Sequence, residues 1–208
     1  MTGIDWYTAR AAGVVAYALL TGGVLLGVLL AGRARLPRWP AFAVTDVHRF
    51  VALLTGVFVV LHVYALLIDR YVHTSVVTVL VPGASAYRPF WVALGTVALE
   101  LLAAVGISNL LRKRLGHARW RRIHYLTFAV WTAATAHGIG AGTDSGAGWL
   151  RLLYVVSIGS VAAALAWRLS PSPARARRAP SRAAAAESAS PSRRGPHRRG
   201  SGPIRRRA

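Results

Sequence analysis

Cysteine is absent from this 208-residue sequence, and Met1 is the only methionine. Disulfide bonds, thiolate–metal sites, iron–sulfur clusters and haem attachment through cysteine are therefore excluded, and so is methionine ligation within the body of the chain. Acidic residues are also scarce, with 6 Asp and Glu against 26 Lys and Arg. If the chain binds a metal or a haem, imidazole is the main soft ligand that remains.

Hydrophobic residues make up 54% of the sequence and gather in five long runs. Each run has about 20 residues, the length that crosses ~30 Å of hydrocarbon. The runs cover 11–31, 47–68, 90–111, 122–141 and 149–167. Because backbone amides in lipid must be satisfied within their own segment, each run predicts a transmembrane helix. We therefore expect an all-α integral membrane protein with about five transmembrane helices in one bundle.

Basic residues are placed on alternate sides of the expected spans. Most of them lie in 31–49, in 112–122 and from Arg168 onward, three stretches that face the same side. The positive-inside rule then predicts a plasma-membrane protein with its N-terminus outside and its C-terminus in the cytoplasm. We expect residues 1–168 to form the membrane domain, in contact with lipid. Residues 169–208 are rich in Arg, Pro, Ser and Ala, which predicts a disordered, solvated basic tail; specific nucleic-acid binding is not expected from it.

Four of the seven histidines lie within or at the ends of two expected spans. His48 and His62 are on the second, and His124 and His137 are on the fourth. Fourteen residues of helix rise about 21 Å, and thirteen rise about 19.5 Å. Because both helices start on the cytoplasmic side, His48 and His124 are expected near that boundary, and the other two near the outer one. Facing helices would present two imidazole pairs at two depths.

A site with two imidazoles suits zinc poorly, since zinc usually takes three or four protein ligands. It suits haem, whose porphyrin supplies four ligands and leaves two axial positions. Two axial histidines leave no open iron position, which favours electron transfer. Thirteen residues on a straight helix leave the second imidazole about 140° from the first. We therefore expect the fourth helix to bend, to bulge, or to meet its haems from different sides.

Three stretches carry a resemblance to a known family: LLRKRLGHARWRRIHYLTF (110–128), WYTARAAGVVAYALL (6–20) and HGIGAGTD (137–144). With histidines fourteen apart on one span and thirteen apart on a later one, the chain resembles the ferric reductase-like transmembrane domain. That family includes the membrane parts of ferric reductases and NADPH oxidases. It also includes the haem subunit of the bacterial periplasmic methionine-sulfoxide reductase system. The resemblance covers roughly residues 5–168.

The resemblance implies two b-type haems, an inner one held by His48 and His124 and an outer one held by His62 and His137. It implies electron transfer from a cytoplasmic donor to an external acceptor such as ferric iron or a partner protein. Larger relatives carry a flavin- and nicotinamide-binding module, but this sequence has no GxGxxG motif in a βαβ stretch. We therefore expect the membrane component of an oxidoreductase, with a separate flavoprotein or a quinol as donor.

Two further charged residues are candidates for roles near the haems. Arg10, at the outer end of the first span, could pair with a propionate of the outer haem, or could simply extend to the membrane interface. Glu100, in the middle of the third span, could handle protons or accept a hydrogen bond from a histidine N–H.

A different class of function also remains open from the residues. The chain could be a non-redox transporter or scaffold whose histidines relay protons or bond between helices. That alternative predicts a colourless protein. No inverted repeat or broken helix pair in the sequence supports transport.

Overall fold

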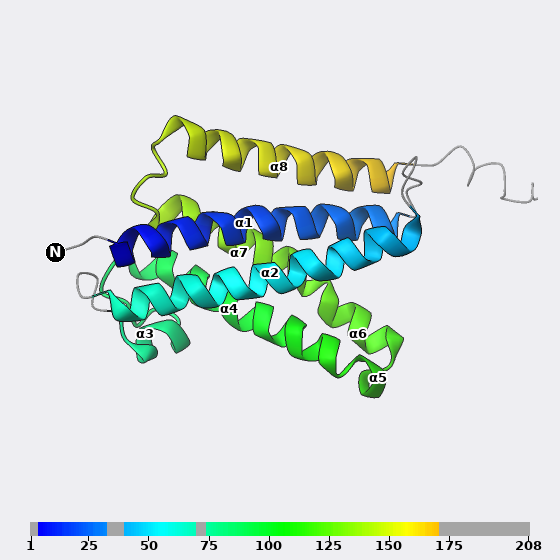
Figure 1. Ribbon diagram of the computed structural model, residues 1–208, viewed down its shortest axis with the longest axis horizontal. Helices are drawn as coiled ribbons and strands as arrows, with labels where there is room; N and C mark the ends of the chain where they lie inside the picture. Colours follow the sequence, from blue (N-terminus) through cyan, green and yellow to red (C-terminus); the bar gives the residue numbers. More distant parts are fainter. Residues whose placement is uncertain (1–3, 33–39, 70–73, 171–208) are drawn as a thin grey trace, which may run out of the picture. The chain divides into compact units, whose positions relative to one another are not determined.

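The computed structural model describes residues 4–32, 40–69 and 74–170 (Figure 1). This part of the chain is helical and contains no β-strand, which confirms the all-α prediction. The expected disordered tail, from residue 171 onward, lies outside the described residues, as do His73 and His197.

Five helices correspond to the five expected spans: α1 (Ile4–Ala31), α2 (Ala41–Ile68), α4 (Pro89–Leu110), α7 (Leu126–Ala141) and α8 (Gly148–Leu169). Three shorter helices lie in the described connections: α3 (Val76–Leu80), α5 (Arg112–Leu115) and α6 (His117–His124). Four of the helices, α1, α2, α4 and α8, are long and apolar enough to cross a membrane. α7 has only 16 residues, about 24 Å of helix, because the fourth expected span is divided.

The division falls at Tyr125, between α6 and α7. The Tyr125 N–H still donates to the Arg121 carbonyl at 3.2 Å, as in an α-helix. The Phe128 N–H then donates to the Tyr125 carbonyl at 3.2 Å, three residues back, so the chain turns more tightly there. The fourth expected span is therefore interrupted directly after His124.

The long helices pack in a bundle around α1, which contacts α2, α7 and α8, while α4 packs against α7 (Figure 1). One buried cluster joins α1, α4 and α7 through Leu20, Ala98 and Val130. A second joins α1 to α8 through Tyr17 and Tyr154, whose ring centroids are 5.2 Å apart. These contacts place α1 at the centre of the bundle, against α2, α7 and α8.

Side-chain hydrogen bonds also tie α7 to α1 inside the bundle. The Trp131 Nε1–H donates to Thr21 Oγ1 at 3.0 Å, and the Thr135 hydroxyl donates to the Tyr17 hydroxyl at 3.2 Å. Lipid offers no alternative partner to such groups, so polar side chains of membrane helices tend to bond across helix interfaces. The bonds help to keep α7 in a constant position relative to α1.

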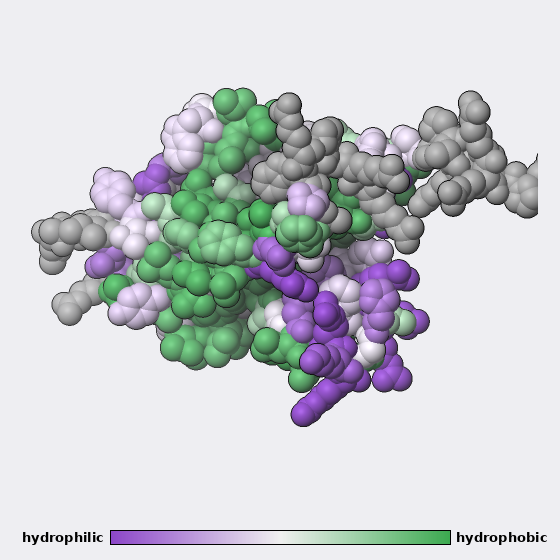
Figure 2. All heavy atoms as spheres, turned by 45° about the vertical axis from the view of Figure 1, so that its right-hand side comes forward, coloured by the Kyte–Doolittle hydropathy of each residue, from purple (hydrophilic) through white to green (hydrophobic). Residues whose placement is uncertain are grey.

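The surface has an apolar body and a strongly basic end (Figure 2). Large apolar side chains such as Leu53, Val57 and Val60 on α2 and Val155 on α8 are exposed, as expected for helices whose solvent is lipid. The hydrophilic residues gather where α5 and α6 lie (Figure 2). We call the exposed basic residues of these two helices the basic platform: Arg112, Lys113, Arg114, His117, Arg119, Arg121 and Arg122.

The close approach of α4 and α7 at Gly140 gives a first test of this packing. A Cβ on Gly140 would overlap the indole ring of Trp91, so Gly140→Ala should lower stability by about 1–3 kcal/mol. The matched control is Gly106→Ala on α4, where an added Cβ meets nothing within 4 Å. Thermal unfolding in detergent should show a lower Tm for the first variant only. Equal Tm values for the two variants would contradict this packing.

Candidate functional site

The four membrane histidines meet in two couples. His48 on α2 faces His124 at the end of α6, with ring centroids 6.2 Å apart and ring planes at 77°. His62 on α2 faces His137 on α7, at 6.5 Å and 76°. We call the first the basic-end pair, since α6 carries the basic platform, and the second the far-end pair. The structure thus brings together the two couples expected from the sequence.

The ring separations match a metal held between two imidazole nitrogens. A metal–nitrogen distance of about 2.0 Å on each side, plus the radius of each ring, places the two centroids about 6 Å apart. A direct hydrogen bond between the two rings would bring their centroids closer together than this separation. No group of three or more His, Cys, Asp or Glu side chains with metal-binding geometry occurs within the described ranges. Each couple therefore offers two protein ligands, the number that haem needs.

Hydrogen bonds orient both rings of the far-end pair. His62 Nδ1 lies 2.6 Å from the carbonyl oxygen of Ala9, and His137 Nδ1 lies 2.9 Å from that of Trp91. A carbonyl oxygen can only accept, so each Nδ1 carries the proton and donates it. Each Nε2 then keeps a lone pair, which is the arrangement typical of histidine ligands to metals.

The basic-end pair is held differently. The Nδ1 atom of His124 is buried and makes no hydrogen bond within the described part of the chain, whereas His48 interacts with the backbone of Gly23 on α1. The ring of His124 instead lies flat on the indole of Trp120, with centroids 5.2 Å apart and planes at 24°.

Three glycines make room for the histidine rings. An added Cβ would lie 3.0 Å from His62 Nδ1 at Gly13, and 2.6 Å from His137 Nδ1 at Gly95. At Gly27 it would lie 3.5 Å from His48 Cε1. None of these glycines was assigned a functional role from the sequence. The available signal was spacing: Gly13 and Gly27 are fourteen residues apart on α1, like His48 and His62 on the antiparallel α2.

Comparison with known proteins identifies the family. Residues 12–135 match the family model described as ferric reductase like transmembrane component. The chain belongs to this family. The matched segment includes three of the four histidines and ends two residues before His137. No curated protein and no solved structure matches the chain.

Membership of the ferric reductase-like family, together with the long apolar helices, makes the chain a multi-pass membrane protein. It also indicates a membrane component of electron transfer, in a family that typically binds haem. The resemblance stated from the sequence is therefore confirmed at the level of the family.

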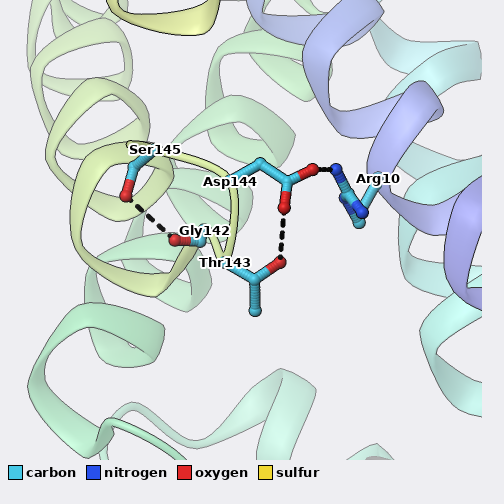
Figure 3. Close-up of polar contacts among 5 residues, drawn as sticks. All are labelled: Arg10, Gly142, Thr143, Asp144 and Ser145. Carbon is cyan, nitrogen blue, oxygen red and sulfur yellow. Dashed lines mark hydrogen bonds and ion pairs between the residues drawn. The ribbon is translucent and has the colours of Figure 1, made fainter. Parts of the chain in front are cut away.

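Arg10, the candidate propionate partner, pairs with Asp144 in the turn between α7 and α8 (Figure 3). Its guanidinium also lies 5.7 Å from the ring centroid of Trp6 and 5.9 Å from that of Tyr7. Ala9, its neighbour on α1, accepts the hydrogen bond from His62. Arg10 therefore lies at the far-end pair and links α1 to the α7–α8 turn.

Glu100 lies on a different side of α4 from Gly95, which contacts the ring of His137. Its side chain is exposed, and it follows Gly95 by five residues, an angular offset of about 140°. The N–H groups of the far-end pair bond to backbone carbonyls instead. The interpretation of Glu100 as a hydrogen-bond partner of a histidine thus finds no support in the geometry.

The contact between Gly95 and His137 predicts a specific defect. Gly95→Ala should push the imidazole away from the Trp91 carbonyl, because the new Cβ would lie 2.6 Å from Nδ1. Purified Gly95→Ala protein should contain less haem than the wild type, measured by a pyridine haemochrome assay. Gly106→Ala, on the same helix but with open space around it, should keep the wild-type content. Full haem content in the Gly95 variant would refute this role.

Proposed function

We propose that this protein carries single electrons across the membrane through two b-type haems. The basic-end pair, His48 and His124, would hold the inner haem, and the far-end pair, His62 and His137, the outer one. One observation carries the proposal: at two depths of one bundle, two histidine rings from different helices face each other at 6.2 and 6.5 Å. Family membership supports it independently.

Haem, when bound, supplies an iron that alternates between the ferric and ferrous states. The chain's own residues would set the conditions for this chemistry. Two histidines at each site would hold the haem and would keep oxygen and water from its metal. The Nδ1–H bonds to Ala9 and Trp91 fix the tautomer and orientation of the far-end rings. Buried apolar residues between the two levels, such as Leu20 and Val130, exclude water from the region that separates them.

The basic platform supports an orientation with the basic end in the cytoplasm and the N-terminus outside. In this orientation electrons enter at His48 and His124 and leave at His62 and His137, toward an external acceptor such as ferric iron or a partner protein. The exposed arginines of α5 and α6 would attract a donor with an acidic surface, which favours a separate flavoprotein over a quinol.

Arg10 is part of the same proposal as a partner of the outer haem's propionate. A guanidinium has five N–H donors and can serve two carboxylates. The ion pair with Asp144 would then hold the side chain in place beside the far-end pair.

Single histidine substitutions test the assignment of two haems. His48→Ala or His124→Ala should remove one haem, and His62→Ala or His137→Ala the other, so each variant should retain about half of the wild-type haem. The reduced-minus-oxidised spectrum and a haem-to-protein ratio measure this. Gly106→Ala on α4 is the control, because an added Cβ there meets nothing within 4 Å. Colourless wild-type protein, or wild-type content in all four variants, would reject the proposal in favour of a non-redox membrane protein.

Electron transfer across a bilayer tests whether both couples act in one relay. Vesicles with the protein in their membrane, ferricyanide inside and dithionite outside should reduce the trapped ferricyanide. His124→Ala and His137→Ala should each stop this transfer, although each variant is expected to retain one haem. Transfer across the membrane needs both haems in series. Gly106→Ala vesicles should match the wild type, because an added Cβ at Gly106 meets nothing within 4 Å. A wild-type rate of ferricyanide reduction in either His124→Ala or His137→Ala would show that the couples do not act in series.

A further inference from the structure

The two couples differ in how their rings are kept in place. In the far-end pair both Nδ1 atoms donate to backbone carbonyls, at 2.6 and 2.9 Å. His124 has no such bond: its Nδ1 is buried and without a hydrogen-bond partner among the described residues. Without a hydrogen bond, a histidine ligand is free to rotate about its metal–nitrogen axis unless packing prevents it.

Packing on Trp120 restricts His124 in this way. The two residues are four apart on α6, so their side chains lie on the same helix face. Their rings are stacked, with centroids 5.2 Å apart and planes at 24°. The chain turns at Tyr125, directly after His124. Of the two ring contacts of His124 in the described part of the chain, the one with Trp120 is stacked and the one with His48 is edge-on.

Trp120 is itself anchored from three directions. Its Nε1–H donates to Asn109 Oδ1 on α4 at 2.7 Å. The Arg112 guanidinium lies 5.5 Å from the indole centroid, a cation–π contact, and the His117 ring lies 5.6 Å away. Asn109 follows Gly95 by fourteen residues, so α4 accommodates His137 at one level and anchors Trp120 at the other.

We propose that Trp120 is the positioning residue of the basic-end pair, fixing the ring plane of His124 as backbone carbonyls fix the rings of the far-end pair. This inference rests on the proposed function, because the ring it positions is the one assigned to the inner haem. Asn109 acts indirectly, because its Oδ1 accepts the hydrogen bond that holds the Trp120 indole. A stack constrains the ring plane without polarising Nδ1, whereas a hydrogen bond to a carbonyl also raises the basicity of the ligand.

The ring planes give this inference a spectroscopic readout. The paramagnetic resonance signal of low-spin ferric haem with two imidazole ligands depends on the angle between the imidazole planes. Both couples have nearly perpendicular rings, at 77° and 76°. Releasing one ring should therefore move the signal of that haem alone. The far-end haem remains in the same sample as an internal reference.

The experiment compares Trp120→Leu, Trp120→Phe and Asn109→Leu in the purified, haem-loaded protein. We expect Trp120→Leu to shift or broaden one of the two low-spin signals and to change one of the two steps in a redox titration. Trp120→Phe, which retains a flat ring, should restore most of the wild-type signal. Asn109→Leu should affect the same signal less strongly, since it leaves the indole in place. Trp149→Leu, at an exposed tryptophan of α8, is the matched control and should change neither signal.

The outcomes separate this inference from the function on which it rests. Wild-type protein without haem would overturn the proposed function, and the role of Trp120 with it. Two haems with unchanged signals and unchanged titration steps in both Trp120→Leu and Asn109→Leu would overturn the role of Trp120 alone. His62→Ala abolishes the signal of the far-end haem. If Trp120→Leu changed that signal, the role of Trp120 would also be overturned, because the effect would fall on the wrong couple. Asn109→Leu keeps the test decisive if Trp120→Leu does not fold.

Discussion

The separation of the histidine rings in each couple is the constraint on which the rest of the structure depends. α2 and the interrupted α6–α7 segment hold their imidazole rings 6.2 and 6.5 Å apart, centroid to centroid, at two levels of the bundle. In hydrocarbon this spacing cannot come from the hydrophobic effect alone, because lipid tails are as apolar as the helix surfaces. It comes from small residues that admit the rings, Gly13 and Gly95, and from hydrogen bonds between helices, such as that from Trp131 to Thr21.

The two segments that carry the histidines differ in the spacing of these residues. The histidines of α2 are fourteen residues apart, nearly a whole number of helical turns, so an unbroken helix presents both on one side. The histidines of the α6–α7 segment are thirteen residues apart, so an unbroken straight helix would present them on different sides. The interruption at Tyr125 lies between these two histidines and shortens α7 to 16 residues. Each histidine of this segment therefore belongs to a different helix, His124 to α6 and His137 to α7.

The two levels also differ chemically. At the far end the rings are held by backbone carbonyls, whose hydrogen bonds also make the imidazoles better electron donors to a metal. At the basic end His124 is held by a stacked indole, which leaves its Nδ1 unpolarised. Ligand environment is one of the main ways in which a protein sets a haem potential. The two proposed haems would therefore have different potentials despite identical ligands, and the difference would originate in residues that touch the ligands rather than the metal.

The number of spans, the basic end and the four histidines follow from the sequence, because hydrophobic length, charge distribution and helical rise are properties of consecutive residues. The family could also be recognised from residues 110–128 and the histidine spacing. The sequence could not say where the fourth helix departs from regularity: Tyr125 is not a proline or glycine, and the turn depends on the helices around it. It also could not assign partners to Arg10, Trp120 or Glu100. Arg10 pairs with a residue 134 positions away, Trp120 depends on Asn109 of another helix, and the direction of Glu100 depends on which face of α4 packs against α7. Such contacts join residues far apart in the chain, so only the tertiary structure determines them.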